Sequence, residues 1–151
     1  MSDSFKTVHH APAYAAGMTP QFDVVGIVVS DMAAAVAFYR RLGLNFPEGA
    51  EQEGHAEAAL PNGMRLTLDT EAVIRSFHAD WTPPTGGGRI GLAFRCADPA
   101  EVDTVYAELV DAGYHGELKP WDAFWGQRYA AVQDPDGNGV DLYAALPSTS
   151  E

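Results

Sequence analysis

Residues 125–146, W-G-Q-R-Y-A-A-V-Q-D-P-D-G-N-G-V-D-L-Y-A-A-L, contain two alternating stretches separated by a dense turn signal. Side chains alternate over residues 129–133 and again over residues 140–144. Between them, D-P-D-G-N-G combines a proline that fixes φ, Asp and Asn side chains that bond their own backbone, and glycines that accept positive φ. The pattern predicts a β-hairpin that forms one wall of a larger structure.

The composition indicates one compact domain without disulfides. The chain has 151 residues, of which 46% are hydrophobic, and Cys96 is its one cysteine. Cys96 lies in an apolar run and is expected to be a small core residue. The formal net charge of -12 argues against nucleic acid and anionic membranes as partners. The chain lacks a long apolar stretch and a signal-peptide pattern, so we expect a cytoplasmic protein.

The first half of the chain begins with a strand and a helix. The β-branched run at residues 22–29 predicts a buried strand. Ser30 or Asp31 then caps a helix whose apolar residues recur at helical spacing from Met32, and Gly43 ends it. Shorter elements are predicted next, with extended segments around residues 44–46, 55–60 and 64–69 and a helical turn at residues 71–78.

The second half repeats this order after a W-T-P-P-T-G-G-G linker at residues 81–88. An apolar run is followed by Asp98 and Pro99, which suit the cap and first position of a second helix. Aligning Asp31 with Asp98 gives an offset of 98 − 31 = 67. The helix-ending glycines differ by 113 − 43 = 70, so the second helix should be about one turn longer.

This repeat predicts an α+β fold of two tandem βαβββ modules that form a curved, partly open mixed sheet around a cleft. Each module would have one sheet face covered by its helix and one bare face. The bare faces together would line the cleft, which is where a small ligand would bind. The predicted boundaries are an N-terminal arm at 1–20, a domain at 21–146 with modules 21–75 and 89–146 joined by a linker at 76–88, and a tail at 147–151.

The motifs G-I-V-V-S-D-M-A-A-A-V-A-F-Y-R-R-L-G-L and D-P-D-G-N-G-V-D-L-Y in this repeat resemble those of the vicinal oxygen chelate superfamily. That group includes glyoxalase I, extradiol dioxygenases and the bleomycin resistance proteins. The resemblance covers roughly residues 21–146. It implies the paired-module fold, whereas function varies among proteins that share this scaffold.

The resemblance also implies where a metal would be bound, with one His, Glu or Gln from each of four strands. Counting from the helix caps, the two first-strand positions fall on Val24 and Gly91, which offer no ligand. The remaining positions fall on Asp141 and near Thr67 or Asp69. Two carboxylates without an imidazole would hold a transition metal weakly, so we expect no metal site and no cofactor.

Two alternatives use the same cleft. His55 and Glu57 lie on one face of their strand by alternation and could rebuild a divalent metal site, as in a dioxygenase. Without a metal, His55, Glu57 or Asp141 could act as the general base of a lyase, isomerase or epimerase. No spacing of nucleophile and base supports the second alternative, so no residue is assigned as catalytic.

The stretch W-G-Q-R-Y-A-A-V-Q-D-P-D-G-N resembles the corresponding segment of the bleomycin resistance proteins. Those proteins lack a metal and sequester a cationic antibiotic in clefts between two subunits. The resemblance therefore implies a homodimer that binds a small molecule and confers antibiotic resistance, and it favours a binding protein over an enzyme. Aromatic side chains for stacking and nearby charges predict ligand contacts by Trp81, Trp121, Phe124, Trp125, Tyr143, Arg128, His55, Glu57, Asp69 and Asp141.

Competing structural interpretations exist for some of these residues. Trp125 could fill the core beside Gly126, and Arg128 could pair with Asp136 or Asp141 rather than with a ligand. Tyr39 and its repeat equivalent on the second helix are expected to be packing residues with hydrogen-bonded hydroxyls.

Overall fold

The computed structural model describes residues 19–86 and 89–148. The predicted N-terminal arm lies almost entirely outside the described residues, as do two residues of the linker and the last three of the tail. None of the helices in the described part of the chain has the length and hydrophobicity needed to cross a bilayer.

The elements form two sheets. The strands of the first half form a three-stranded sheet in the order β1-β3-β2, and those of the second half form a four-stranded sheet in the order β4-β7-β6-β5. The elements are β1 (Val24–Val29), α2 (Met32–Arg41), the 3-10 turn η2 (Ala50–Gln52), β2 (His55–Ala59), β3 (Arg65–Thr70), α3 (Glu71–Phe77), β4 (Gly91–Arg95), α4 (Pro99–Asp111), β5 (Gly116–Ala123), β6 (Gln127–Gln133) and β7 (Gly139–Ala145).

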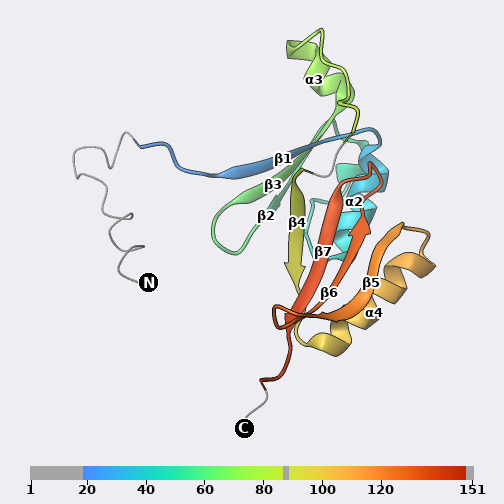
Figure 1. The fold of residues 1–151 in the computed structure, drawn as a ribbon. Coiled ribbons are helices and arrows are strands. Elements are labelled where there is room, and N and C mark those ends of the chain that lie inside the picture. Colours follow the sequence, from blue (N-terminus) through green and yellow to red (C-terminus); the bar gives the residue numbers. More distant parts are fainter. Residues whose placement is uncertain (1–18, 87–88, 149–151) are drawn as a thin grey trace.

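Both sheets are mixed and open. β1 runs parallel to β3 and β4 runs parallel to β7, while the remaining pairs are antiparallel. Figure 1 shows α4 behind the four-stranded sheet, with no helix over the face turned to the viewer, and the three-stranded sheet crossing above it. The predicted fold class, α+β with two related modules on partly open sheets, is confirmed.

The two long helices begin in the same way, as the repeat predicts. The Asp31 carboxylate accepts a hydrogen bond from Ala34 N at 3.1 Å, and the Asp98 carboxylate accepts one from Glu101 N at 2.9 Å. Each bond satisfies a backbone N–H that the first turn leaves unpaired. The helices have 10 and 13 residues, which confirms that the second is about one turn longer.

One core joins the modules. Fully buried side chains of α2, such as Phe38, lie in the same cluster as Leu68 of β3 and Leu142 of β7. The Tyr39 hydroxyl donates to the buried Asp134 carboxylate in the β6–β7 turn at 2.7 Å, which links α2 to the second module. This confirms the packing role expected for Tyr39 with its bonded hydroxyl.

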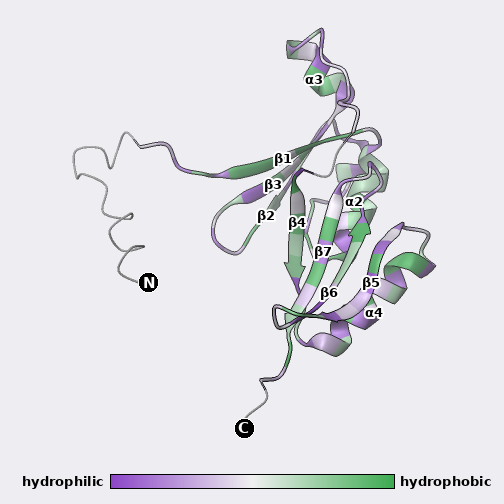
Figure 2. Cartoon of the chain, viewed as in Figure 1, coloured by the Kyte–Doolittle hydropathy of each residue, from purple (hydrophilic) through white to green (hydrophobic). Residues whose placement is uncertain are grey.

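β1 is hydrophobic along most of its length, as Figure 2 shows. Its even-numbered and odd-numbered side chains lie on opposite faces of the sheet, with Val29 fully buried against the core. The strand that the sequence predicts at residues 22–29 begins at Val24, two residues later than expected. The hairpin between β2 and β3 and the short helix α3 also lie where the sequence predicts them.

The prediction of an extended strand segment at residues 44–46 was wrong. These residues belong to no strand, and the first module has three strands rather than four. The Arg40 guanidinium donates to the carbonyls of Phe46 at 3.1 Å and Pro47 at 2.9 Å. Backbone acceptors that a sheet would use are thus bound by a side chain of the preceding helix.

Candidate functional site

The uncovered face of the four-stranded sheet carries most of the predicted aromatic residues. Tyr129 of β6 lies directly opposite Trp121 of β5 and Tyr143 of β7. Opposed residues of neighbouring strands point to the same face. Ala130 and Val132 alternate with Tyr129 and are fully buried on the other face, against α4. Three strands therefore place aromatic rings on the same open surface.

Four rings form what we call the aromatic platform: Trp121, Phe124, Trp125 and Tyr129. The Trp125 ring is at its centre, with centroid distances of 5.6 Å to Trp121, 5.0 Å to Phe124 and 5.3 Å to Tyr129. All three contacts are edge-to-face, the geometry that aromatic pairs favour. The platform is built from interlocking rings on two strands and the turn between them.

The platform is open to solvent although its atoms are mostly apolar. Phe124 is 90% exposed, Trp125 48% and Trp121 40%. Gly126 has a φ of 94°, so the β5–β6 turn takes a conformation that presents both preceding aromatic residues on its surface. The Trp125 indole N–H donates to the Gln127 side chain at 2.9 Å, which fixes the ring. A contiguous exposed apolar patch of this kind is typical of a binding surface.

Asp141 supplies a negative charge beside these rings. It lies on β7 directly opposite Ala131, and thus on the same face as Tyr129. Burial, together with a hydrogen bond to the Asp141 carboxylate, raises the pKa of Tyr129 to about 12. The tyrosine hydroxyl therefore stays protonated at neutral pH beside the carboxylate.

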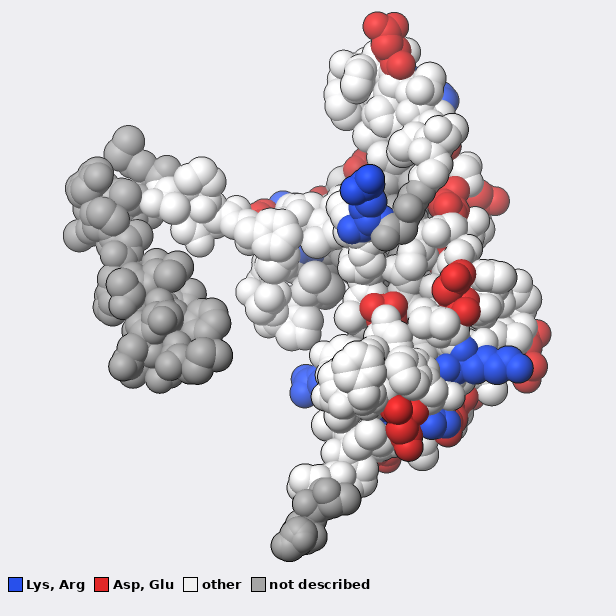
Figure 3. Space-filling view, in the orientation of Figure 1, with Lys and Arg blue, Asp and Glu red and all other residues white. Residues whose placement is uncertain are grey.

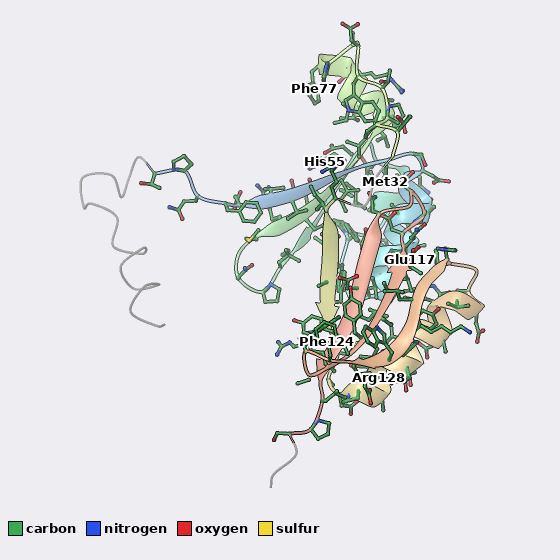
Figure 4. The ribbon with its side chains drawn as sticks, viewed as in Figure 1. Met32, His55, Phe77, Glu117, Phe124 and Arg128 are labelled. Carbon is green, nitrogen blue, oxygen red and sulfur yellow. The ribbon has the colours of Figure 1, made fainter. Side chains whose placement is uncertain are left out.

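Figure 4 shows Phe124 at the lower end of the four-stranded sheet, well away from His55 in the three-stranded sheet. In the same orientation, Figure 3 shows a mostly uncharged surface over this end of the sheet, with both acidic and basic side chains around it. The predicted ligand contacts thus fall into separate groups on the two sheets.

Arg128 lies on the opposite face of β6 from the platform. Its guanidinium donates to Asp103 of α4 at 2.9 Å and to Asp122 of β5 at 2.9 Å. The sequence suggested that Arg128 could form an ion pair with Asp136 or Asp141. It does form ion pairs, but with two other carboxylates. Alternation from Tyr129 would have placed Arg128 on the helix side from the sequence alone.

His55, Glu57 and Asp69 come together on the three-stranded sheet. His55 Nδ1 lies 2.6 Å from Asp69 Oδ1, and its Nε2 lies 2.8 Å from Glu57 Oε2. Arg65, which no sequence pattern indicated, joins Glu57 to Asp23 through two ion pairs. Hydrogen bonds to Glu57 and then Asp69 raise the pKa of His55. Because both of its ring nitrogens are engaged by carboxylates, the His55 imidazole presents no free nitrogen to act as a base or to bind a metal ion.

This arrangement predicts a pH-dependent contribution of His55 to stability. A pKa raised in the folded protein means that the contribution is fully present below the ordinary value of 6.5 and is lost as pH rises through the folded pKa. His55→Gln should therefore lower the Tm most at about pH 5 and progressively less towards about pH 9. Thermal unfolding across this range would show it, and a difference that grows with pH would contradict it.

Trp81 lies apart from the platform. It lines a pocket of about 440 Å³ between the modules, together with β1, Pro83, Ile90 and the β6–β7 turn. The Arg75 guanidinium lies over its ring at 5.4 Å from the centroid. Trp81 therefore belongs to a second concave surface, and the structure does not bring it to the other predicted ligand contacts.

Comparisons with known proteins agree with this architecture. The family model for the glyoxalase/bleomycin resistance protein/dioxygenase superfamily matches residues 21–142. The chain belongs to this superfamily. A search of curated protein sequences finds no significant match.

Solved structures of the superfamily share the fold at low sequence identity. A family enzyme from Burkholderia phytofirmans is 18% identical with a TM-score of 0.71, covering 82% of this chain and 98% of that one. A protein described as a glyoxalase/bleomycin resistance protein/dioxygenase from Nocardioides is 23% identical with a TM-score of 0.67, covering 99% and 98%. A glyoxalase-related enzyme from Fulvimarina pelagi is 20% identical with a TM-score of 0.70, covering 83% and 88%.

The metal site implied by the superfamily does not fit this chain. Val24 of β1 and Gly91 of β4 offer no donor atom at two of the four positions, whereas Asp69 is bonded to His55 and Asp141 lies beside Tyr129 on the other sheet. Across residues 19–86 and 89–148, no group of three or more His, Cys, Asp or Glu side chains could hold an ion. Two carboxylates on different sheets make a poor set of ligands for a transition metal.

Proposed function

We propose that this superfamily member is a metal-independent binding protein for a small cationic aromatic molecule, such as an antibiotic or a metabolite. The observation that carries the proposal is the exposed aromatic platform on the uncovered sheet face, with the Asp141 carboxylate on that face. Sequestration of such a molecule would protect its targets and so confer resistance.

The chemistry of the platform suits this class of ligand. Rigid rings lose little conformational entropy on binding and present flat apolar surfaces for stacking. A cation held against a Trp or Tyr face gains about 0.5–2 kcal/mol, more when water is excluded. The net charge of -12 further favours cationic over anionic molecules.

The donor set at the superfamily's metal positions supports the metal-independent part of the proposal. Elemental analysis of protein purified without an affinity tag or chelator tests it directly. We expect less than 0.1 equivalent of iron, manganese, nickel or zinc. One equivalent of any of these would favour the alternative of a metalloenzyme with relocated ligands and would direct attention to His55, Glu57, Asp69 and Asp141.

Tryptophan fluorescence tests the ligand class. Titration with 9-aminoacridine, a planar cation, should quench the emission and saturate, whereas anthracene-9-carboxylate, an anion of similar shape, should bind at least about tenfold more weakly. Asp141→Asn should narrow that difference in affinity by removing a carboxylate from the platform's face. Equal affinity for the two probes would overturn the preference for a cation. Recovery of chemically altered ligand would favour the lyase or isomerase alternative.

A further inference from the structure

A cavity of about 280 Å³ lies on the helix side of the four-stranded sheet. It is bounded by the end of α2, the end of β4 and the first two turns of α4, together with Leu142 of β7. Leu142 is fully buried between Asp141 and Tyr143 along β7, so its side chain points away from the face of the aromatic platform. We call this space the helix-side cavity, and it is separate from every ligand contact considered above.

The lining of the helix-side cavity is mostly apolar. Phe94 of β4 lies directly opposite Leu142 of β7, so the two side chains share a face. The volume is just below the range of about 300–1,000 Å³ typical of pockets for drug-sized ligands, so it suits a smaller molecule. The apolar residues that line it are Leu42, Phe94, Cys96, Val105 and Leu142.

Two arginines also line this cavity. Neither Arg41 nor Arg95 forms an ion pair with any carboxylate that the structure describes. Carboxylates are plentiful in this chain, which has 21 acidic and 9 basic residues. The arginines that do pair with them are Arg40, Arg65, Arg75 and Arg128. The helix-side cavity therefore combines apolar walls with two cations whose charge no described side chain neutralises.

Stacking holds Arg41 in place without using its hydrogen-bond donors. Its guanidinium lies over the Tyr114 ring, 6.0 Å from the centroid, and Tyr114 contacts Phe38 edge-to-face at 4.9 Å. A stacked guanidinium is bound through its flat face, while its N–H groups point outward in the plane of the group. These donors can bind a carboxylate in the bidentate geometry that arginine favours.

Glu101 is the one acidic residue among the described residues that line the cavity. Its carboxylate accepts a hydrogen bond from Ala97 N at 2.6 Å, which directs it to the start of its own helix. The pocket lined by Trp81 has the opposite character, because the carboxylates of Glu71 and Asp136 line it and no Lys or Arg does among the described residues. The two cavities therefore favour ligands of opposite charge.

We propose that the helix-side cavity binds a small carboxylic acid whose apolar body is a single ring or a short chain. The carboxylate would lie against the guanidiniums of Arg41 and Arg95, and the apolar body against Phe94 and Leu142. An inorganic anion would leave the apolar walls unused, and a cation would meet two positive charges. The inference goes beyond the proposed function, because this ligand is an anion and its site lies on the other face of the sheet.

Cys96 provides a reporter inside the cavity. It is the one cysteine of the chain and is partly exposed. Burial, followed by the nearby carboxylates of Glu101 and Asp98, raises the pKa of its thiol, so alkylation should be slow. Iodoacetamide forms a carbon–sulfur bond with the thiolate and releases iodide. The rate of this reaction, followed by the mass of the intact protein, measures access to the cavity.

Benzoate tests the proposal as the probe. At about pH 8 it should slow the alkylation of Cys96 in a saturable way, with a Kd of about 1 mM or tighter. Benzylamine and benzyl alcohol, a cation and a neutral molecule with the same ring, should bind at least about threefold more weakly. Isothermal titration calorimetry measures the same affinities without the thiol. Equal affinity for the three probes, or no binding of benzoate at ~20 mM, would overturn the proposal.

Three variants locate the probe. Arg41→Gln and Arg95→Gln should each weaken benzoate binding at least about threefold and keep the Tm, because both side chains are exposed. Lys119→Gln is the matched control: it removes the same charge from an exposed position on β5, outside the cavity, and should leave the affinity unchanged. An equal loss in all three variants would indicate a general effect of charge and overturn the site.

The outcome is independent of the aromatic platform. No tryptophan is among the described residues that line the helix-side cavity, so quenching by 9-aminoacridine reports on a different surface. Arg41→Gln and Arg95→Gln should leave the affinity for that dye unchanged. Loss of benzoate binding with intact binding of the dye, or the reverse, would distinguish the failure of one proposal from the failure of the other.

Discussion

Asp134→Ala is expected to lower the free energy of unfolding by about 3–5 kcal/mol. The Asp134 carboxylate is 5% exposed and accepts hydrogen bonds from the Tyr39 hydroxyl at 2.7 Å, Asp136 N at 2.9 Å, Asn138 N at 2.9 Å and Asn138 Nδ2 at 2.8 Å. Alanine would leave these donors without their acceptor, and each bond to a charged group contributes about 1.5–3 kcal/mol. Urea denaturation monitored by circular dichroism would measure the loss.

Two further variants distinguish the stability that Asp134 gives to the β6–β7 turn from the stability that it gives to the contact with α2. Tyr39→Phe removes one donor and should cost about 1–2 kcal/mol. Asp136→Ala is the matched control in the same turn: its exposed carboxylate accepts only weakly from Ser30 N, at 3.2 Å and 3.4 Å, and its loss should cost less than about 1 kcal/mol. If Asp134→Ala cost no more than Asp136→Ala, the buried network would not stabilise the fold.

The hairpin of residues 125–146 was predictable because its signals are local. Asp134 accepts from two backbone N–H groups within the turn, and Gly137 has a φ of 87°. Alternation then determines which residues of β6 and β7 share a face. The bond from Asp134 to Tyr39 was not predictable in this way, since it joins residues 95 positions apart and depends on how α2 packs against the second module.

The misplaced segment at 44–46 shows where local patterns fail. Residues 44–46 suit a strand by composition. The Arg40 guanidinium, however, donates hydrogen bonds to the carbonyls of Phe46 and Pro47, so these acceptors are not free to pair with another strand. A side chain in the last turn of a helix reaches the chain that follows it, and strand propensity does not include this interaction. The charge of Arg40 was visible in the sequence, whereas its target was not.

The candidate site was predicted in part. The platform residues follow from composition and turn chemistry, and the shared face of His55 and Glu57 follows from alternation. The platform and the cluster around His55 lie apart because they are on different sheets. How two sheets pack against each other cannot be read from the residue pattern of a single strand. The role of Tyr129 between Trp125 and Asp141 was missed for the same reason, because Asp141 comes from the neighbouring strand.

Trp125→Ala should weaken binding of 9-aminoacridine by about 10- to 100-fold while costing only about 1–2 kcal/mol in stability. The ring is 48% exposed, so its removal opens no closed cavity in the core. It contacts all three other rings of the platform, so its loss also frees Trp121 and Phe124 from their edge contacts. Titration with the cationic probe and urea denaturation measure the two effects on the same protein.

Phe77→Ala supplies the matched control for an exposed aromatic residue. Phe77 is 73% exposed on α3, far from the platform in Figure 4, so its removal should change neither probe affinity nor stability appreciably. If Trp125→Ala lost stability and affinity in equal proportion, Trp125 would be a packing residue and the loss of binding a consequence of unfolding. Full retention of affinity for the probe in Trp125→Ala would show that the ligand does not bind at the platform. The pocket lined by Trp81 would then be the next surface to test.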